Sequence, residues 1–148
     1  VHDEGAAMLG GVSGHAGLFS NSYEVAIVLQ AMIQKGIYDN LKLFSKDSFD
    51  KFNFCYFCDK NNRSGVGFDK PQIEGKHGST FGGVSTESFG HYGYTGSMAW
   101  ADPDKNIIFI FLSNRTYPTR ENTLLQTSNT RTRSQEIVYK SLIDSKWK

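Results

Sequence analysis

Three short apolar segments in the second half of the chain, separated by tight turns, constrain its fold more than any other feature. They cover residues 88–95, 97–102 and 107–112, and residues 102–106 form a turn in which proline supplies the fixed φ that such a turn requires. The last segment does not alternate between apolar and polar residues. We therefore expect both of its faces to be buried, as in a central strand with helices packed on each side.

Helical periodicity appears before and after these predicted strands. In residues 21–36, Asn21 and Glu24 resemble a capping box, and apolar residues recur at helical spacing until Gly36 ends the run. A second helix is expected from Ser45 or Asp47 to about Phe57, and a closing helix over residues 134–144. The closing helix is expected to place Ile137, Val138 and Leu142 on one side. Helices on either side of consecutive strands indicate an α+β domain, with an antiparallel sheet flanked by helices.

The remaining segments are rich in glycine or polar residues. Residues 1–19 contain five glycines among small residues, so we expect a tightly packed irregular segment there. Gly65–Phe68 is a short strand candidate that ends at Asp69-Lys70-Pro71. The polar stretch over residues 113–133 is expected to be a long loop, and loops of this length often carry function.

Length and charge exclude several classes of protein. The 148 residues fit one domain, and 16 Lys and Arg against 15 Asp and Glu give a net charge of +1. Such a balance creates no field that attracts nucleic acid or an anionic membrane. The longest apolar runs, such as residues 107–112, fall far short of the ~20 residues of a membrane-spanning helix. We expect neither nucleic acid nor a membrane span.

Cys55 and Cys58 are the only two cysteines, and their spacing is that of redox dithiols and of half a zinc site. Zinc needs four ligands, whereas the chain has no second cysteine pair and no closely spaced histidines, so we expect no metal and no cofactor. Buried free thiols flanked by aromatic residues are the favoured interpretation. A disulfide is the alternative if the protein is exported.

The segment Phe89–Gly96 is the strongest candidate for a functional site. His91 lies on a predicted strand, and Gly93 and Gly96 remove side chains beside it, so that an acyl group could lie against bare backbone amides. The plainer interpretation also has weight. A strand histidine between aromatic residues is more often structural than catalytic, and the glycines alone would indicate only a bulge or close packing.

These residues resemble the third active-site motif of the serine β-lactamase and penicillin-binding-protein superfamily. That motif reads Lys-Thr-Gly, or His-x-Gly in many esterase-like members, and His91-Tyr92-Gly93 takes its place. The likeness covers nearly the whole chain and points to the class C-type branch, in particular to the β-lactamase-like domain fused behind family-three glycoside hydrolases in Bacteroidetes-type proteins. Further segments that carry it are residues 1–4, 10–20, 65–71, 94–103 and 111–118.

The resemblance implies the C-terminal part of the β-lactamase/transpeptidase-like fold and an acyl-enzyme serine hydrolase, periplasmic or secreted, that acts on cell-wall esters or peptides. It assigns catalytic roles to His91, which would polarise a substrate carboxylate or join the proton network, and to Tyr94, whose N–H would supply half of an oxyanion hole. It implies that Gly93 keeps the cleft open. The other expected substrate-binding residues are Tyr92, Thr95, His15 and Arg115.

The chain departs from this family in one important respect. Members use a Ser-x-x-Lys motif, whose serine attacks the carbonyl carbon, and a Tyr-x-Asn-like motif; both would precede Val1. Literal matches at residues 48–51, 145–148 and 38–40 lie at the wrong places, and a helix start at Ser48 and a turn at residues 38–40 explain two of them. The family's sheet also takes two strands from the N-terminal part. Without them a strand edge stays exposed, unless that part or a second copy of the chain covers it.

We therefore expect residues 1–148 to form a single partial domain, the C-terminal fragment of a serine hydrolase that is inactive alone. Its expected partners are a small acyl or peptide substrate and the missing N-terminal part of the same protein. The alternative is a non-catalytic module that binds a ligand or packs beside a glycoside hydrolase. A Ser-x-x-Lys motif upstream in the parent protein would favour hydrolysis, and its absence would favour binding.

Overall fold

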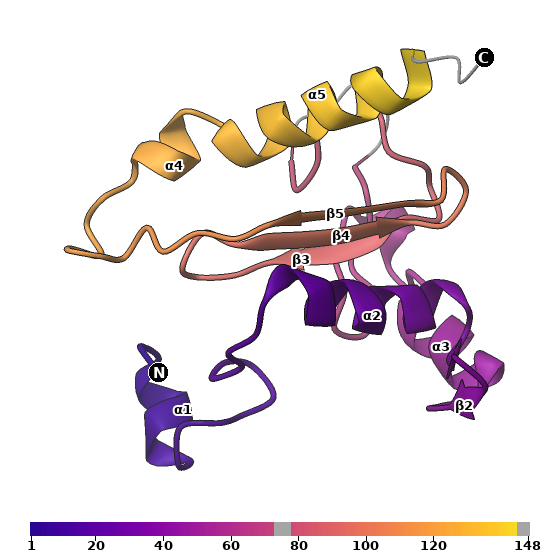
Figure 1. Ribbon diagram of the computed structural model, residues 1–148, viewed down its shortest axis with the longest axis horizontal. Coiled ribbons are helices and arrows are strands. Elements are labelled where there is room, and N and C mark those ends of the chain that lie inside the picture. Colours follow the sequence, from indigo (N-terminus) through magenta and orange to yellow (C-terminus); the bar gives the residue numbers. More distant parts are fainter. Residues whose placement is uncertain (73–77, 145–148) are drawn as a thin grey trace.

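A three-stranded antiparallel sheet lies between helices that cover its two faces (Figure 1). The computed structural model describes residues 1–72 and 78–144. Strands β3 (Phe89–Tyr92), β4 (Met98–Asp102) and β5 (Ile107–Phe111) stand in the order β3-β4-β5. This arrangement confirms the α+β architecture with an antiparallel sheet flanked by helices.

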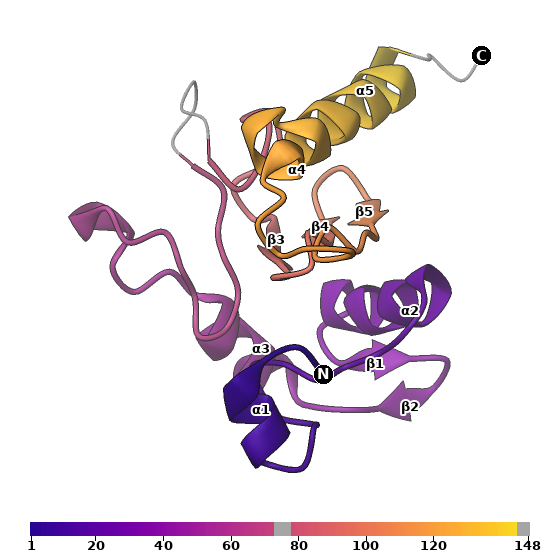
Figure 2. The ribbon, with the colours of Figure 1, turned by 90° about the vertical axis from the view of Figure 1, so that its left-hand side faces the viewer.

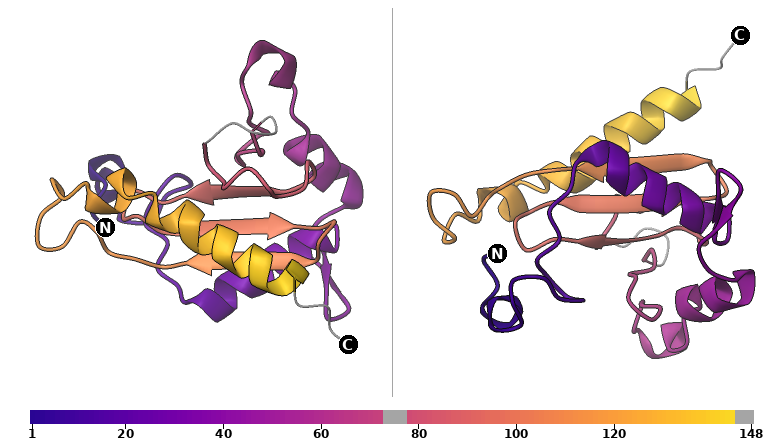
Figure 3. Two further views of the ribbon diagram at one scale, coloured as in Figure 1. Left: turned by 90° about the horizontal axis from the view of Figure 1, so that it is seen from above. Right: turned by 60° about the horizontal axis from the view of Figure 1, so that its bottom comes forward.

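Side-chain alternation along the strands divides the core into two layers. On one face, Phe89 and Ala101 pack with Leu29 of helix α2 (Ser22–Ile33). On the opposite face lies a second layer, which helix α5 (Thr130–Asp144) covers (Figures 2 and 3). The buried residues of that layer are Met98, Trp100 and Phe109. Each strand of the sheet therefore has both faces covered, which is why apolar residues run without interruption through β5.

Strand β5 lies at an edge of the sheet, so its expected central position was wrong. Among the described residues β5 pairs only with β4, which is the central strand. Ile107 and Phe109 are nevertheless only 8% and 7% exposed. An apolar run without polar residues indicates that both faces of a strand are covered. It does not indicate whether the strand has a neighbouring strand on one side or on both.

The first two predicted helices are present, although the second is shorter than expected. In α2 the Asn21 side chain caps the helix by accepting the N–H of Glu24 at 3.1 Å, and Gly36 follows its end with φ of 96°. Helix α3 (Lys46–Asn53) begins at its N-cap Ser45 as predicted. It ends four residues before Phe57, because Phe54 already has an extended backbone. A hairpin of β1 (Ile37–Tyr38) and β2 (Leu41–Lys42) joins the two helices and was not predicted.

The N-terminal segment is neither irregular throughout nor tightly packed, contrary to expectation. It contains helix α1 (Glu4–Met8), where the Asp3 carboxylate accepts the N–H of Ala6 at 2.7 Å. Figure 1 shows the segment projecting away from the sheet. Its large apolar side chains are 69% to 89% exposed, namely Met8, Leu9, Val12, Leu18 and Phe19. We call residues 1–20 the N-terminal arm.

Residues 65–68 form a turn and not the predicted strand. The turn lies between the isolated bridge partners Ser64 and Asp69, and Gly67 within it has φ of 100°. Asp69 is in turn bridged to Gly90 on the outer side of β3. The segment thus covers part of the free edge of β3 without becoming a strand.

The long polar segment after β5 is partly helical, which was also not predicted. It contains α4 (Leu124–Thr127), and α5 begins at Thr130, four residues before the predicted start at 134. The expected apolar side of α5 was wrong, because Ile137 is 66% exposed whereas Gln135 and Tyr139 are buried. Residues 130–133 hold no apolar side chain, so hydrophobic periodicity could not reveal the first turn of this helix.

A buried carboxylate, Asp102, connects the end of β4 to the surrounding elements. It accepts hydrogen bonds from the backbone N–H and the hydroxyl of Ser85, from the N–H of Lys105 at 3.2 Å and from the hydroxyl of Tyr139 at 3.2 Å. Burial, together with the nearby Asp102 charge, raises the pKa of Tyr139. One side chain thus holds the β4–β5 turn, the preceding loop and α5 together.

Cys55 and Cys58 form a disulfide, so the expectation of buried free thiols was wrong. Both cysteines are half-buried, and Tyr56 and Phe57 between them are exposed. The disulfide lies in a projection formed by residues 54–62, which includes the short helix η1 (Cys58–Lys60) and extends to the left in Figure 2. We call these residues the disulfide finger.

Candidate functional site

The candidate site lies where β3 ends, at an edge of the sheet. Gly90 exchanges hydrogen bonds with Asp69 at 2.8 and 3.2 Å on the outer side of the strand. Backbone groups of successive strand residues point to opposite sides, so those of His91 point toward β4 and those of Tyr92 point outward. Gly93 again faces the β4 side, because its N–H donates to the carbonyl oxygen of Ser97 at 2.7 Å. An open edge therefore begins at Tyr92.

A tight turn follows, and among the described residues the backbone N–H groups of its two central residues have no hydrogen-bond partner. Gly96 donates its N–H to the carbonyl of Gly93 at 2.9 Å, which makes Tyr94 and Thr95 the central residues of the turn. Within the parts of the chain that the structure describes, the N–H of Tyr94 makes no hydrogen bond. The N–H of Tyr94 is the one to which the family resemblance assigns the role of an oxyanion donor.

The segment after β5 fixes this turn in place. Thr95 accepts hydrogen bonds through its carbonyl from the Ser113 hydroxyl at 3.1 Å and from the Arg115 N–H at 2.9 Å. From α5, Arg131 reaches the carbonyl of Gly96 at 3.4 Å. Two segments distant in sequence thus hold the carbonyls of the turn, whereas the Tyr94 N–H stays free.

Gly96→Ala is expected to destabilise the chain by about 2 kcal/mol, because Gly96 combines a positive φ of 95° with close neighbours. A Cβ there would lie 2.3 Å from Leu125 Cδ2 and 2.6 Å from Ser113 Oγ. Urea unfolding followed by circular dichroism measures the loss. Gly93→Ala is the matched control, since the nearest atom is 3.6 Å from its Cβ position. Equal losses in the two variants would contradict this account.

His91 is exposed at the end of β3, and its ring has a defined orientation. Its Nδ1 lies 2.6 Å from the carbonyl oxygen of Tyr92. A carbonyl only accepts hydrogen bonds, so Nδ1 carries the proton, and in the neutral ring Nε2 is the unprotonated nitrogen. The exposed side chain can therefore accept a proton through Nε2.

The Tyr94 ring is held between two side chains. It stacks on His2 of the N-terminal arm at 5.9 Å, and the guanidinium carbon of Arg115 lies 4.8 Å from the ring centroid. Arg115 also donates from Nε to the Tyr94 carbonyl at 3.0 Å and from one terminal nitrogen to the carbonyls of Arg120 and Asn122. Its guanidinium thus holds the loop after β5 against the turn, and contact with a substrate anion stays a prediction.

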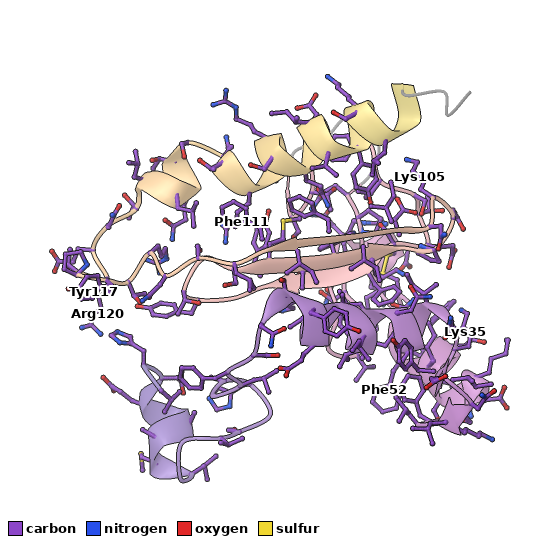
Figure 4. All side chains as sticks on the ribbon, viewed as in Figure 1. Lys35, Phe52, Lys105, Phe111, Tyr117 and Arg120 are labelled. Atoms are coloured by element: carbon purple, nitrogen blue, oxygen red, sulfur yellow. A yellow bond between two sulfur atoms is a disulfide. The ribbon has the colours of Figure 1, made fainter. Side chains whose placement is uncertain are left out.

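A shallow depression of about 240 Å³ lies beside Tyr94. Figure 4 shows Arg120 and Tyr117 on the loop after β5, at the end of the sheet opposite Lys105. The lining residues other than Tyr94 are His2, Asp3, Glu4, Gly5 and Arg120. His2 and Arg120 were not predicted as site residues, because they reach the depression only through the folding of the N-terminal arm and of the loop after β5.

The structure places His15 on the N-terminal arm, apart from the other predicted site residues. Its Nε2 lies 2.8 Å from Asp3 Oδ1 and its Nδ1 lies 2.9 Å from the Ser13 hydroxyl. The Ala6 N–H and, next, the His15 hydrogen bond lower the pKa of Asp3. His15 reaches the depression only through Asp3, which is one of its lining residues.

Tyr92 points toward α5. Arg131 lies over its ring at 3.9 Å, and burial raises the pKa of the phenol. The residues that the structure brings together are Tyr92, Gly93, Tyr94, Thr95 and Arg115, with His91 adjacent on β3. Arg131 was missed because it fell in a segment taken for a loop; a spacing of four residues from Arg131 to Gln135 and Tyr139 was the available signal.

The literal nucleophile motifs have structural roles where the structure describes them. Ser48 is exposed on α3, where its hydroxyl lies 2.8 Å from that of Ser45 and its N–H donates to the Ser45 hydroxyl. Asp39 and Asn40 form the β1–β2 turn with positive φ. Ser145 lies outside the described residues, as does His77. Over residues 1–72 and 78–144, no group of three or more His, Cys, Asp and Glu side chains could hold a metal ion, and no helix is long and apolar enough to cross a bilayer.

An antiparallel sheet between helices, with an exposed histidine and unpaired turn amides at the end of β3, defines a mixed α+β domain. A sequence profile of the family described as Beta-lactamase matches residues 2–130. The chain therefore belongs to the Beta-lactamase family, and it is a fragment of that fold.

Curated relatives support the same assignment. Proteins named "Putative D-alanyl-D-alanine carboxypeptidase" from Salmonella enteritidis and Salmonella gallinarum are 37% identical to the chain over 119 residues, and that of Salmonella typhi is 36% identical. Each alignment covers 78% of this chain but 26% of the relative. The chain thus spans about a quarter of the length of these relatives.

Proposed function

We propose that the chain is the C-terminal portion of a serine hydrolase of the D-alanyl-D-alanine carboxypeptidase type, which cleaves a peptide or ester bond of a cell-wall-related substrate through an acyl-enzyme. The observation that carries the proposal is the free N–H of Tyr94, which stands in a fixed turn directly after His91-Tyr92-Gly93. The names of the 37% identical relatives support the substrate class.

The roles divide between this chain and polypeptide that precedes it in the parent protein. A serine hydroxyl from the upstream part would attack the substrate carbonyl carbon, forming the acyl-enzyme and expelling the leaving group. The Tyr94 N–H would donate to the oxyanion, together with the N–H of that serine. His91 would accept or return a proton through Nε2, or contact the substrate carboxylate. Gly93, Thr95, Tyr92, His15 and Arg115 would line or support the cleft.

The upstream part of the protein is the partner that this proposal requires. The outer edge of β5 pairs with no strand among the described residues, and unpaired edges normally need a cover. Ile137 on α5 and the apolar side chains of the N-terminal arm are exposed as well. Two additional strands from upstream would cover the edge. In their absence a second copy of the chain would compete for it.

A periplasmic or secreted location is part of the proposal. The Cys55–Cys58 disulfide supports it, because such bonds persist in oxidising compartments. The resemblance to domains fused behind glycoside hydrolases suggests the second candidate, a packing or ligand-binding module without hydrolysis. The charged depression beside Tyr94 is the feature that such a module would use.

Hydrolysis of nitrocefin, p-nitrophenyl esters and an acyl-D-alanyl-D-alanine peptide tests the proposal, with the chain alone and with the chain joined to its upstream region. We expect activity only in the joined protein. His91→Ala in that protein should lower kcat/KM by roughly 100-fold or more, as expected for loss of a proton-transfer group. Lys42→Ala, on the exposed β1–β2 hairpin, is the control that should keep full activity.

Three results would contradict the proposal. Hydrolysis by the chain alone that survives Ser48→Ala would reveal a nucleophile within these residues. Full activity of the joined His91→Ala variant would remove His91 from the mechanism. Binding of the peptide by the joined protein without any hydrolysis would favour the packing or ligand-binding module.

A further inference from the structure

We propose that the Cys55–Cys58 disulfide is a reversible thiol–disulfide exchange site, reduced and reoxidised while the chain stays folded. The inference is independent of the proposed hydrolase activity. It concerns the disulfide finger, which contributes no residue to the candidate site.

The disulfide contributes little to the stability of the fold as a crosslink. It joins residues three positions apart, whose Cα atoms lie 5.5 Å from each other. The stabilisation that a crosslink gives by restricting the unfolded chain grows with the length of the closed loop, so a loop this short gains the least.

Hydrogen bonds hold the finger by themselves. The carbonyl of Phe57 accepts the N–H groups of Lys60 and Asn62 at 3.0 and 3.1 Å, and that of Cys58 accepts the N–H of Asn61 at 3.2 Å. Asn61 closes the turn with φ of 63°. These contacts involve no sulfur atom, so reduction of the disulfide removes none of them directly.

The structure also offers a partner for the reduced form. Cys55 Sγ lies 3.4 Å from the carbonyl oxygen of Asn62, within reach of a thiol S–H that donates to a carbonyl. Reduction therefore creates a thiol that already has an acceptor. Neither cysteine must move into the core, since both are half-buried at the surface.

Access for a reductant is the remaining requirement, and the finger provides it. It projects from the side of the molecule on which β3 forms the sheet edge (Figures 2 and 3). Phe54, Tyr56 and Phe57 beside the sulfurs are exposed. Cys55 and Cys58 are themselves half-buried at the surface, so their disulfide is more accessible than a buried structural bond, and accessible disulfides are the more labile ones.

The co-reactant is a dithiol, either a small molecule or the active site of a dithiol protein. One of its thiolates attacks a sulfur of the pair, forming a mixed disulfide and releasing the other cysteine as a thiolate that takes up a proton. The second thiol of the reductant then attacks the mixed disulfide and releases the remaining cysteine. Two electrons pass to the chain, which gains two thiols, and the reductant leaves as its disulfide.

Native-state reduction tests the proposal. The folded chain is treated with millimolar dithiothreitol at neutral pH, and free thiols are counted by alkylation and mass spectrometry. We expect both cysteines to be alkylated within minutes, with an unchanged far-UV circular dichroism spectrum, and the disulfide to return on addition of oxidised glutathione. The Cys55→Ser/Cys58→Ser variant should show the same spectrum and urea midpoint as the reduced chain.

Three outcomes would overturn the proposal. Resistance to dithiothreitol until urea unfolds the chain would make the disulfide structural. Loss of the native spectrum on reduction, or in the double serine variant, would do the same. Failure of glutathione to restore the bond would show that exchange is not reversible.

Discussion

Asp102→Ala is expected to lower the free energy of unfolding by about 4 kcal/mol, the largest effect of any single substitution considered for this chain. The side chain is fully buried and accepts four hydrogen bonds. Each hydrogen bond to a charged group contributes roughly 1.5–3 kcal/mol, and the cost of burying the Asp102 carboxylate offsets a large part of the sum, which leaves a net loss of about 4 kcal/mol. Domains of this size have only about 5–15 kcal/mol in total, so the variant should be marginally stable.

Urea unfolding at neutral pH measures this loss. Asp104→Ala removes the same group two residues further along the β4–β5 turn, where the side chain is exposed, and should change stability by less than about 0.5 kcal/mol. Tyr139→Phe removes a single donor and should fall between the two. Coincident unfolding midpoints for Asp102→Ala and Asp104→Ala would refute the role assigned to the buried carboxylate.

The second large effect is a rise in stability on alkalinisation, caused by Lys70. Its side chain is only 6% exposed, and among the residues that the structure describes its ammonium group donates to two neutral oxygens, Asn53 Oδ1 at 3.4 Å and the Glu87 carbonyl at 3.2 Å. Burial lowers the pKa of Lys70 from 10.5 to about 8, although the Glu87 charge opposes the shift. Between these two values the unfolded chain binds more protons than the folded one. Stability should therefore rise from pH 8 toward pH 10, by on the order of 2–3 kcal/mol.

Tyrosines set the upper limit of this window. Burial raises the pKa of Tyr139 and Tyr92 above 10.0, so above that pH the unfolded chain loses protons that the folded chain keeps, and stability should fall again. Urea midpoints measured from pH 7 to pH 11 should thus pass through a maximum. Lys70→Met should abolish the rising limb and keep the falling one, whereas Lys42→Met on the exposed hairpin should leave both. A rising limb that persists in Lys70→Met would assign it to another group.

Local signals in the sequence predicted the regular elements of the sheet well. The three strands and the Pro103 turn follow from short apolar runs bounded by turn residues, and α2 follows from its cap and its periodicity. The beginning of α5 was not predicted because the contacts of its first turns are polar, and no hydrophobic pattern marks them. Arg131 contacts the Tyr92 ring and the Gly96 carbonyl, and Gln135 accepts the N–H of Phe81. The position of β5 within the sheet was not predicted either, because strand order depends on pairing between strands, which the sequence of a single strand does not determine.

Apart from Arg115, which the family resemblance supplied, the candidate site was predictable only within one segment of chain. His91 through Thr95 are neighbours in sequence, so the motif placed them together, and the structure keeps them so. His2 and Arg120 meet Tyr94 across the fold, and nothing in their own surroundings in the sequence indicates it. The same limit applied to the cysteines, whose spacing permits thiols, a metal site or a disulfide, and only the local backbone geometry decides among them.

Hydrogen bonds from Ser113, Arg115 and Arg131 hold the 93–96 turn in one conformation. This rigidity has a consequence for the proposed hydrolase. A dipole that already points where negative charge will develop needs no realignment when the reaction begins, so the work of orienting it is done once, at folding, and not in every turnover. In the proposed hydrolase, loosening any of these three anchors would slow the chemical step while leaving the rest of the sheet intact.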